Sequence, residues 1–167
     1  MTAHDVLDLM DLLDQQGIPA WLDGGWGVDA LLGTQTREHD DVDIIVAVAD
    51  APLLMAALAG RGYRLAEGGP PKGFVLRDDA GRQVDVHPVT FTAAGDGIYL
   101  MQDDREWCYS PTSFTGRGEV RGRPVHCLTA EAQVLDHTGY PSDDGDVADM
   151  RALAHRFGVS LPPEYQE

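Results

Sequence analysis

The sequence predicts an α+β protein, close to the α/β type, in which a small mixed sheet is flanked by helices and further helices follow near the C-terminus. Segments with strand and helix periodicity follow the order β–α–β–α–β–β, and two helical segments come after them. The composition, 43% hydrophobic and 24% charged, is that of a globular chain. Its 167 residues fit one domain, 1–167, with a core over about 1–98 and a C-terminal part over about 99–167.

Apolar spacing and breaker residues outline the elements of the first third of the chain. Residues 6–13 carry one apolar helical face, and the breakers at 17–19 end this helix. Residues 20–22 predict a short strand, and 26–33 predict a short helix closed by glycine. The segment 41–48, rich in β-branched residues, predicts a strand.

The middle of the chain predicts one helix and then mostly strands and turns. Asp50 is a plausible N-cap for a helix that continues to Leu58. Residues 63–69 predict a strand, and residues 73–89 predict a hairpin around the turn "DDAG". The segment "GRGEVRGRP", residues 116–124, is expected to be a loop.

Two helices are predicted in the C-terminal part. Thr129 caps the first, over residues 130–138, and Gly139 closes it. The second covers roughly 146–157, with Val147, Met150, Ala154 and Phe157 on one face. The acidic stretch "PSDDGDVAD" before it is interpreted as a solvated loop and helix start.

The net charge of −16 limits the classes of partner. Such a chain repels nucleic acid, and instead attracts metal ions or a cationic small molecule. No apolar run approaches the ~18 residues of a membrane span, and the acidic N-terminal segment is unlike a signal peptide. We therefore expect a cytoplasmic protein with no membrane partner, in which Cys108 and Cys127 remain reduced.

The segment "WLDGGWGVDALLGTQTREHDDVDIIV" places two carboxylates in an otherwise apolar strand. Side chains alternate along a strand, so Asp41 and Asp43 share one face, with Cα atoms about 6.5 Å apart. In "RQVDVHPV", Asp85 and His87 share a face of a second strand. If the two strands are neighbours, three carboxylates meet and need a cation between them, and their hard oxygen ligands suit Mg²⁺.

Two adjacent glycines, Gly24 and Gly25, lie between a short strand and a helix. Backbone N–H groups at such a place can approach an anion closely, so the pair predicts a phosphate-binding turn. Arg37 can neutralise phosphate charge nearby. Glycines followed by a same-face aspartate pair and a third aspartate are typical of phosphoryl transfer.

Structural explanations compete with each of these functional ones. Asp41 and Asp43 can be solvent-facing residues of an edge strand. Asp23 and Asp29 are expected at the surface, and Trp21 and Trp26 suit a core as well as a base-stacking site. The histidines of these segments, His39 and His87, are expected to support the site by hydrogen bonds rather than bind metal.

The pattern "GGWGVDALLG…TREHDDVDIIV" resembles the nucleotidyltransferase motif of the polymerase-beta superfamily. It is most similar to the small antibiotic nucleotidyltransferases, the lincosamide nucleotidyltransferases and aminoglycoside 2''-adenylyltransferases. The C-terminal segments "CLTAEAQVLDHTGY" and "DVADMRALAHRF" resemble the helices of that family. The motif positions are filled here by Gly24, Gly25, Trp26, Arg37, His39, Asp41, Asp43 and Asp85.

The resemblance implies transfer of a nucleoside monophosphate, most simply AMP from ATP, to a hydroxyl of a small molecule. Mg²⁺ would bridge the triphosphate and the two aspartates Asp41 and Asp43. Asp85 would complete the metal site, act as general base toward the hydroxyl, or do both. Gly24, Gly25, Trp26, Arg37 and His39 would bind the nucleotide.

The acceptor implied is an aminoglycoside or a lincosamide, whose positive charge suits an acidic chain. Two alternatives remain at this point: a protein-modifying or antitoxin-type nucleotidyltransferase, and a non-catalytic nucleotide-binding module. A homodimer is expected, because a second subunit would complete an open acceptor site.

Overall fold

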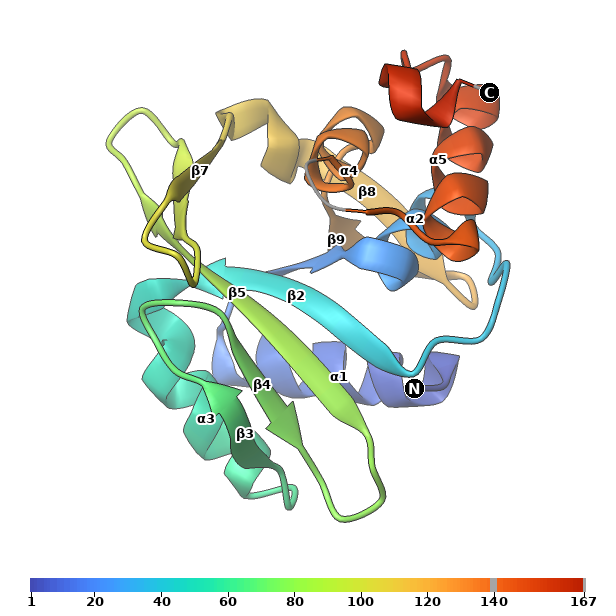
Figure 1. The fold of residues 1–167 in the computed structure, drawn as a ribbon. Helices are drawn as coiled ribbons and strands as arrows, with labels where there is room; N and C mark the ends of the chain where they lie inside the picture. The colour runs from blue at the N-terminus through green and yellow to red at the C-terminus, as the bar shows by residue number, and fades with distance from the viewer. Residues whose placement is uncertain (139–140, 167) are drawn as a thin grey trace.

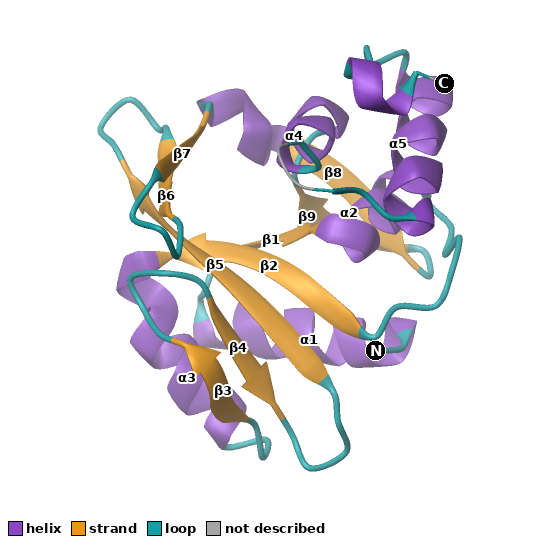
Figure 2. Cartoon of the chain, viewed as in Figure 1, coloured by secondary structure: helices purple, strands orange, loops and turns teal. Residues whose placement is uncertain are grey.

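The computed structural model describes residues 1–138 and 141–166, and within them one mixed sheet of nine strands carries helices on both faces (Figures 1 and 2). The strands are β1 (Ala20–Asp23), β2 (Asp41–Ala47), β3 (Arg64–Gly68), β4 (Phe74–Arg77), β5 (Gln83–Phe91), β6 (Gly97–Leu100), β7 (Glu106–Tyr109), β8 (Gly116–Val120) and β9 (Arg123–Cys127). The helices are α1 (Ala3–Gln16), α2 (Gly24–Leu32), α3 (Ala51–Ala59), α4 (Ala130–Asp136) and α5 (Asp144–Phe157). This arrangement confirms the predicted fold class.

The strand order is β3–β4–β5–β2–β1–β9–β8, and β6 and β7 extend the sheet from the end of β5. Strand β2 runs parallel to β5 and antiparallel to β1, while β1 runs parallel to β9. Because β2 lies in the interior of the sheet, its two aspartates do not belong to an edge strand. That explanation for them was wrong.

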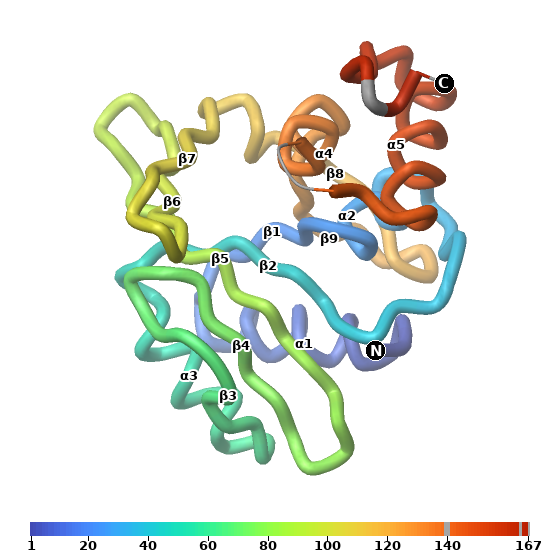
Figure 3. The backbone as a smooth tube through the Cα atoms, viewed as in Figure 1, coloured from blue at the N-terminus to red at the C-terminus, as the bar shows by residue number. Residues whose placement is uncertain are grey.

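Helices α1 and α3 cover one face of the sheet, and α2, α4 and α5 lie together on the other side (Figure 3). The first face holds the main core, because α1 and α3 pack against Val42, Ile44, Val84 and Val86, each at most 1% exposed. A second apolar cluster joins α2, α4, α5 and Tyr165. The alternate residues of β2 and β5 therefore face away from α1 and α3.

Two segments differ from the sequence expectation near the site. Residues 116–124, expected to be a loop, contain β8 and the start of β9, which form a hairpin. Strand β8 is glycine-rich because α2 crosses it closely: a Cβ on Gly118 would meet the backbone of Ala30. Helix α2 begins at Gly24, two residues earlier than expected, because Asp23 caps it.

The C-terminal helices also differ in their ends. Helix α4 ends at Asp136, and the expected stop at Gly139 lies outside the described residues. Helix α5 begins at Asp144, because Asp143 and Asp146 form a capping box before the first turn. Phe157, expected on the packed face of that helix, is 41% exposed and lies under the Arg156 guanidinium.

No helix in the described part of the chain is long and apolar enough to cross a membrane.

Asp5 ties the start of α1 to the β4–β5 turn. It accepts hydrogen bonds from the Thr2 backbone (2.8 Å) and from Arg82 Nη1 (3.1 Å). Arg82 also donates to Asp78 in that turn. Burial raises the pKa of Asp5, but the hydrogen bonds from Thr2 and Arg82 outweigh it and lower that pKa to about 2. The charged carboxylate is therefore a stabilising group at neutral pH.

We predict that Asp5→Asn lowers the free energy of unfolding at pH 7 by on the order of 2 kcal/mol. The folded pKa lies below the ordinary value of 3.8, so this stabilisation is present above about pH 4 and is lost as the pH falls toward 2. Urea unfolding at pH 7 and pH 3 should show the difference from wild type shrinking at the lower pH. Asp8→Asn, which changes an exposed carboxylate of the same helix, is the control; an equal loss from it would contradict the assignment.

Candidate active site

Three aspartates lie side by side across three neighbouring strands. Asp23 of β1 pairs with Asp43 of β2, and Asp43 pairs with Asp85 of β5. Residues opposite one another on paired strands point to the same side of a sheet. Asp41, two residues before Asp43, also shares this face. The structure thus brings Asp41, Asp43 and Asp85 together on the face opposite α1 and α3.

Burial and nearby negative charge raise the pKa of two of these carboxylates, Asp43 and Asp85. Burial, with the negative charges of Asp23, Asp41 and Asp85, raises the pKa of Asp43 to about 7, although the positive charge of His87 opposes the shift. Burial and Asp41 also raise the pKa of Asp85, against a hydrogen bond from Gln83. A cation beside them would remove the repulsion.

The donor set at this face fits a hard divalent cation. In the described part of the chain, no three His, Cys, Asp or Glu side chains already surround one point as metal ligands do. A Mg²⁺ ion held by Asp41 and Asp43 would take its remaining oxygen ligands from phosphate and water, which is its usual mode of binding.

His87 lies between Asp23 and Asp43 on the same face. Its Nδ1 is 3.4 Å from Asp23 Oδ2, and its Nε2 is 3.9 Å from Asp43 Oδ1. Burial lowers the pKa of His87, but the hydrogen bond with Asp23 and the charge of Asp43 outweigh it and raise that pKa to about 9. The imidazolium therefore offsets part of the local negative charge at neutral pH.

The glycine pair begins α2 directly beside the aspartates. Gly24 has a positive φ of 57°, and its N–H donates to the Asp23 side chain at 2.8 Å. A Cβ on Gly24 would collide with the Asp43 carboxylate, whereas one on Gly25 would lie 2.5 Å from the His39 ring and 2.8 Å from Arg37 Nη2. Gly24 therefore lets the Asp43 carboxylate approach the backbone of α2, and Gly25 does the same for His39 and Arg37. Of the two, Gly24 alone has a positive φ.

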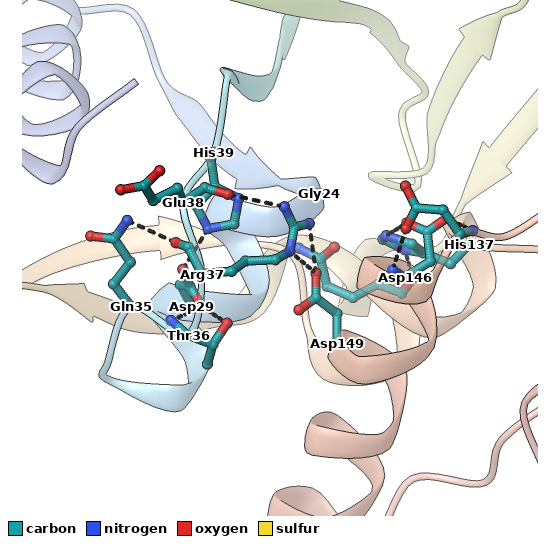
Figure 4. Close-up of polar contacts among 12 residues, drawn as sticks. Gly24, Asp29, Gln35, Thr36, Arg37, Glu38, His39, His137, Asp146 and Asp149 are labelled. Carbon is teal, nitrogen blue, oxygen red and sulfur yellow. Dashed lines mark hydrogen bonds and ion pairs between the residues drawn. The ribbon is translucent and has the colours of Figure 1, made fainter.

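The loop between α2 and β2 is fixed by a buried carboxylate (Figure 4). Asp29 Oδ2 is 2.6 Å from His39 Nε2, and Asp29 Oδ1 accepts from the Thr36 backbone at 2.9 Å and from its hydroxyl at 2.6 Å. The His39 ring also contacts the Trp26 ring in a tilted arrangement, with ring centroids 4.8 Å apart. Asp29 was expected on the helix surface, but it is 2% exposed because it anchors this loop.

A cleft of about 390 Å³ collects most of the predicted site residues. Its wall includes Gly24, Gly25, Trp26, Arg37, His39, Asp41 and Asp43. Asp85 lines a neighbouring cavity of about 300 Å³ instead, and His87 lines both. The carboxylate row thus runs from one cavity to the other.

Several cleft residues were not identified from the sequence. Asp136 and His137 of the α4 end, with Asp143 and Asp146 of the α5 start, close the cleft opposite the glycines. Burial and the negative charge of Asp23 raise the pKa of Asp136 well above its usual range. The stretch "PSDDGDVAD" was interpreted as solvated, which is wrong for Asp149, since this residue is 2% exposed. Asp143 is exposed as expected, and both Asp143 and Asp146 line the cleft.

Asp23 was also expected at the surface but is 4% exposed, because it caps α2 and contacts His87. Its position directly before "GG" was the available signal, since aspartate is a preferred N-cap residue.

Sequence comparisons relate this chain to enzymes that modify antibiotics. A family model described as aminoglycoside-2''-adenylyltransferase matches residues 5–153. A lincosamide resistance protein of Staphylococcus haemolyticus is 30% identical over 161 residues, covering 92% of this chain and 94% of that protein. A 2''-aminoglycoside nucleotidyltransferase of Klebsiella pneumoniae is 29% identical over 130 residues, covering 78% of this chain and 69% of that protein.

Solved structures show the same fold. The crystal structure of the lincosamide antibiotic adenylyltransferase LnuA, lincomycin-bound, has a TM-score of 0.82 at 28% identity, covering 92% of this chain and 96% of that chain. The crystal structure of ANT(2'')-Ia in complex with adenylyl-2''-tobramycin has a TM-score of 0.73 at 23% identity, covering 92% of this chain and 87% of that chain. The resemblance to antibiotic nucleotidyltransferases is therefore confirmed.

We predict that Gly25→Val weakens ATP binding by at least about tenfold while the fold is retained. The branched side chain would displace His39 and Arg37 and would block approach of a phosphate to the backbone. Calorimetric titration with ATP and Mg²⁺ measures the effect, and circular dichroism checks the fold. Gly69→Val, at an open position outside the cleft where a Cβ would meet no atom within 4 Å, is the control for the titration. Unchanged ATP affinity in folded Gly25→Val would limit the glycine to a role in the turn.

Proposed function

Because the chain belongs to the aminoglycoside-2''-adenylyltransferase family and is a nucleotidyltransferase, we propose a specific reaction for it. It transfers AMP from ATP to a hydroxyl of a small antibiotic, with Mg²⁺ as cofactor. The observation that carries this proposal is the register of the sheet, which aligns Asp43 with Asp85 beside the glycines of α2. Positioning and charge neutralisation are the main demands of such a reaction.

The nucleotide is assigned to the 390 Å³ cleft. The first turn of α2 offers the backbone N–H of Gly25 to the triphosphate, since that of Gly24 donates to Asp23, and Arg37 and His39 flank this turn. Asp41 and Asp43 would hold Mg²⁺, which supplies positive charge to the triphosphate when bound. In this assignment the Mg²⁺ ion offsets the repulsion between the crowded carboxylates of β2.

The acceptor is assigned to the 300 Å³ cavity on the other side of His87. Its wall combines the carboxylates of Glu67 and Asp85 with apolar surface from Val75 and Tyr99. The Gln83 amide donates to Asp85 Oδ1 at 2.8 Å and so fixes this carboxylate. An acceptor with an apolar body and a basic amine suits such a wall.

The chemistry follows from these two positions. The acceptor hydroxyl gives its proton to the Asp85 carboxylate as its oxygen forms a bond to the α-phosphorus of ATP. The bond between the α-phosphorus and the bridging oxygen of the β-phosphate breaks, and pyrophosphate leaves. We assign Asp85 both roles, base and secondary metal ligand, because it neighbours Asp43 and also lines the acceptor cavity.

A lincosamide is the first acceptor class to test and an aminoglycoside the second. The relative whose sequence is matched over 94% of its length is a lincosamide resistance protein. The acceptor cavity is also partly apolar. Incubation with ATP or GTP, Mg²⁺ and one antibiotic of each class, followed by product mass, tests the proposal. We expect the lincosamide to gain one AMP with release of pyrophosphate. A mass increase of one AMP on protein instead of the antibiotic would contradict a small-molecule acceptor.

We predict that Asp85→Asn lowers turnover by roughly 10²–10⁴ because the acceptor proton loses its destination. Nucleotide affinity should fall less than in Asp41→Asn, because the β2 pair lies closest to the triphosphate in this assignment. Asp79→Asn, an exposed carboxylate in the turn before β5, serves as control. Steady-state rates and ATP titrations at low and high Mg²⁺ measure both effects. Full turnover of Asp85→Asn at low Mg²⁺ would exclude both roles.

The homodimer and the cytoplasmic location stay predictions from the sequence. Light scattering of the purified chain is the direct test of the dimer.

A further inference from the structure

The Arg37 guanidinium lies between the first turns of two helices. A Cβ on Gly25 of α2 would lie 2.8 Å from its Nη2, and a Cβ on Gly145 of α5 would lie 3.4 Å from its Nε. Glycine at both places lets the flat guanidinium lie against the two backbones. The group is therefore confined on two sides before any ligand binds.

A carboxylate of α5 fixes the remaining freedom of this arginine (Figure 4). Arg37 Nη2 and Nε donate to Asp149 Oδ2 at 2.9 and 3.3 Å, and Nη1 donates to the Glu38 carbonyl at 3.4 Å. The Asp149 side chain is 3% exposed, whereas that of Arg37 is 39% exposed. One partner is thus a buried anchor, and the other reaches the cleft.

The charges of the cleft make this arginine important for an anionic ligand. Among the described residues that line the cleft, Arg37 is the sole arginine or lysine, and six aspartates line the same walls. A guanidinium has five N–H groups, and the three contacts above leave two for a phosphate oxygen. A guanidinium held in place binds phosphate with less loss of side-chain entropy than a free one.

We propose that Asp149 is a positioning residue for nucleotide binding, which holds the Arg37 guanidinium beside Gly25 so that it meets the triphosphate of ATP. This inference rests on the proposed function, because it takes the triphosphate to lie in this cleft. It also gives α5, which is remote from the motif in the sequence, a direct part in the nucleotide site.

The sign of one substitution separates positioning from simple electrostatics. Asp149→Asn removes a negative charge near the triphosphate, which by charge alone would tighten ATP binding. Loss of positioning has the opposite effect, because the neutral amide holds the guanidinium more weakly. We expect ATP–Mg²⁺ affinity to fall by about tenfold in Asp149→Asn, with part of it restored in Asp149→Glu.

A double-mutant cycle with Arg37→Ala completes the test. If Asp149 acts through Arg37, Asp149→Asn has no further effect on ATP affinity in the Arg37→Ala background. Arg151→Ala, an exposed residue of α5, is the matched control, and thermal unfolding shows that each variant is folded at the titration temperature.

The outcomes are distinct. Tighter ATP binding by Asp149→Asn, or an equal loss of affinity with and without Arg37, overturns the positioning role. Failure of the unmodified chain to bind ATP overturns the proposed function itself, and this inference with it.

Discussion

The parallel pairing of β2 with β5 is the constraint on which the rest of the site depends. Its register runs from Asp41 opposite Gln83 to Ala47 opposite Val89. On one face of these strands, valine and isoleucine side chains are almost fully buried under α1 and α3. A slip by one residue would bury the carboxylates and expose the apolar side chains, at a large cost. Hydrophobic burial on one face therefore keeps the carboxylates crowded on the other.

The histidines of the site are held in the same indirect way. His39 is oriented by Asp29 and His87 by Asp23, and in each pair the carboxylate is more than nine-tenths buried. Such pairs fix the ring orientation of a histidine and limit its movement. The site thus has a ready arrangement of donors on one side and carboxylates on the other, so that ligand binding requires little reorganisation.

The C-terminal helices contribute to the site because α2 lies at the junction of two cores. Its residue Trp26 packs in the main core, whereas Val28 packs with α4, α5 and Tyr165. The Tyr165 hydroxyl donates to the His137 carbonyl and ties the end of the described chain to the end of α4. Helix packing, rather than sheet pairing, therefore brings the acidic residues of α4 and α5 to the cleft.

The sequence by itself determined the fold class and the shared face of Asp41 and Asp43, because strand alternation and helix breakers act over a few residues. It also identified the motif residues that line the cleft. Only the tertiary structure decided that Asp23 joins the carboxylate row, that Asp29 and Asp149 are buried anchors, and that Asp85 faces a separate cavity. Each of these depends on contacts between segments distant in the chain, and an aspartate has the same local pattern whether it is solvated or buried beside a partner.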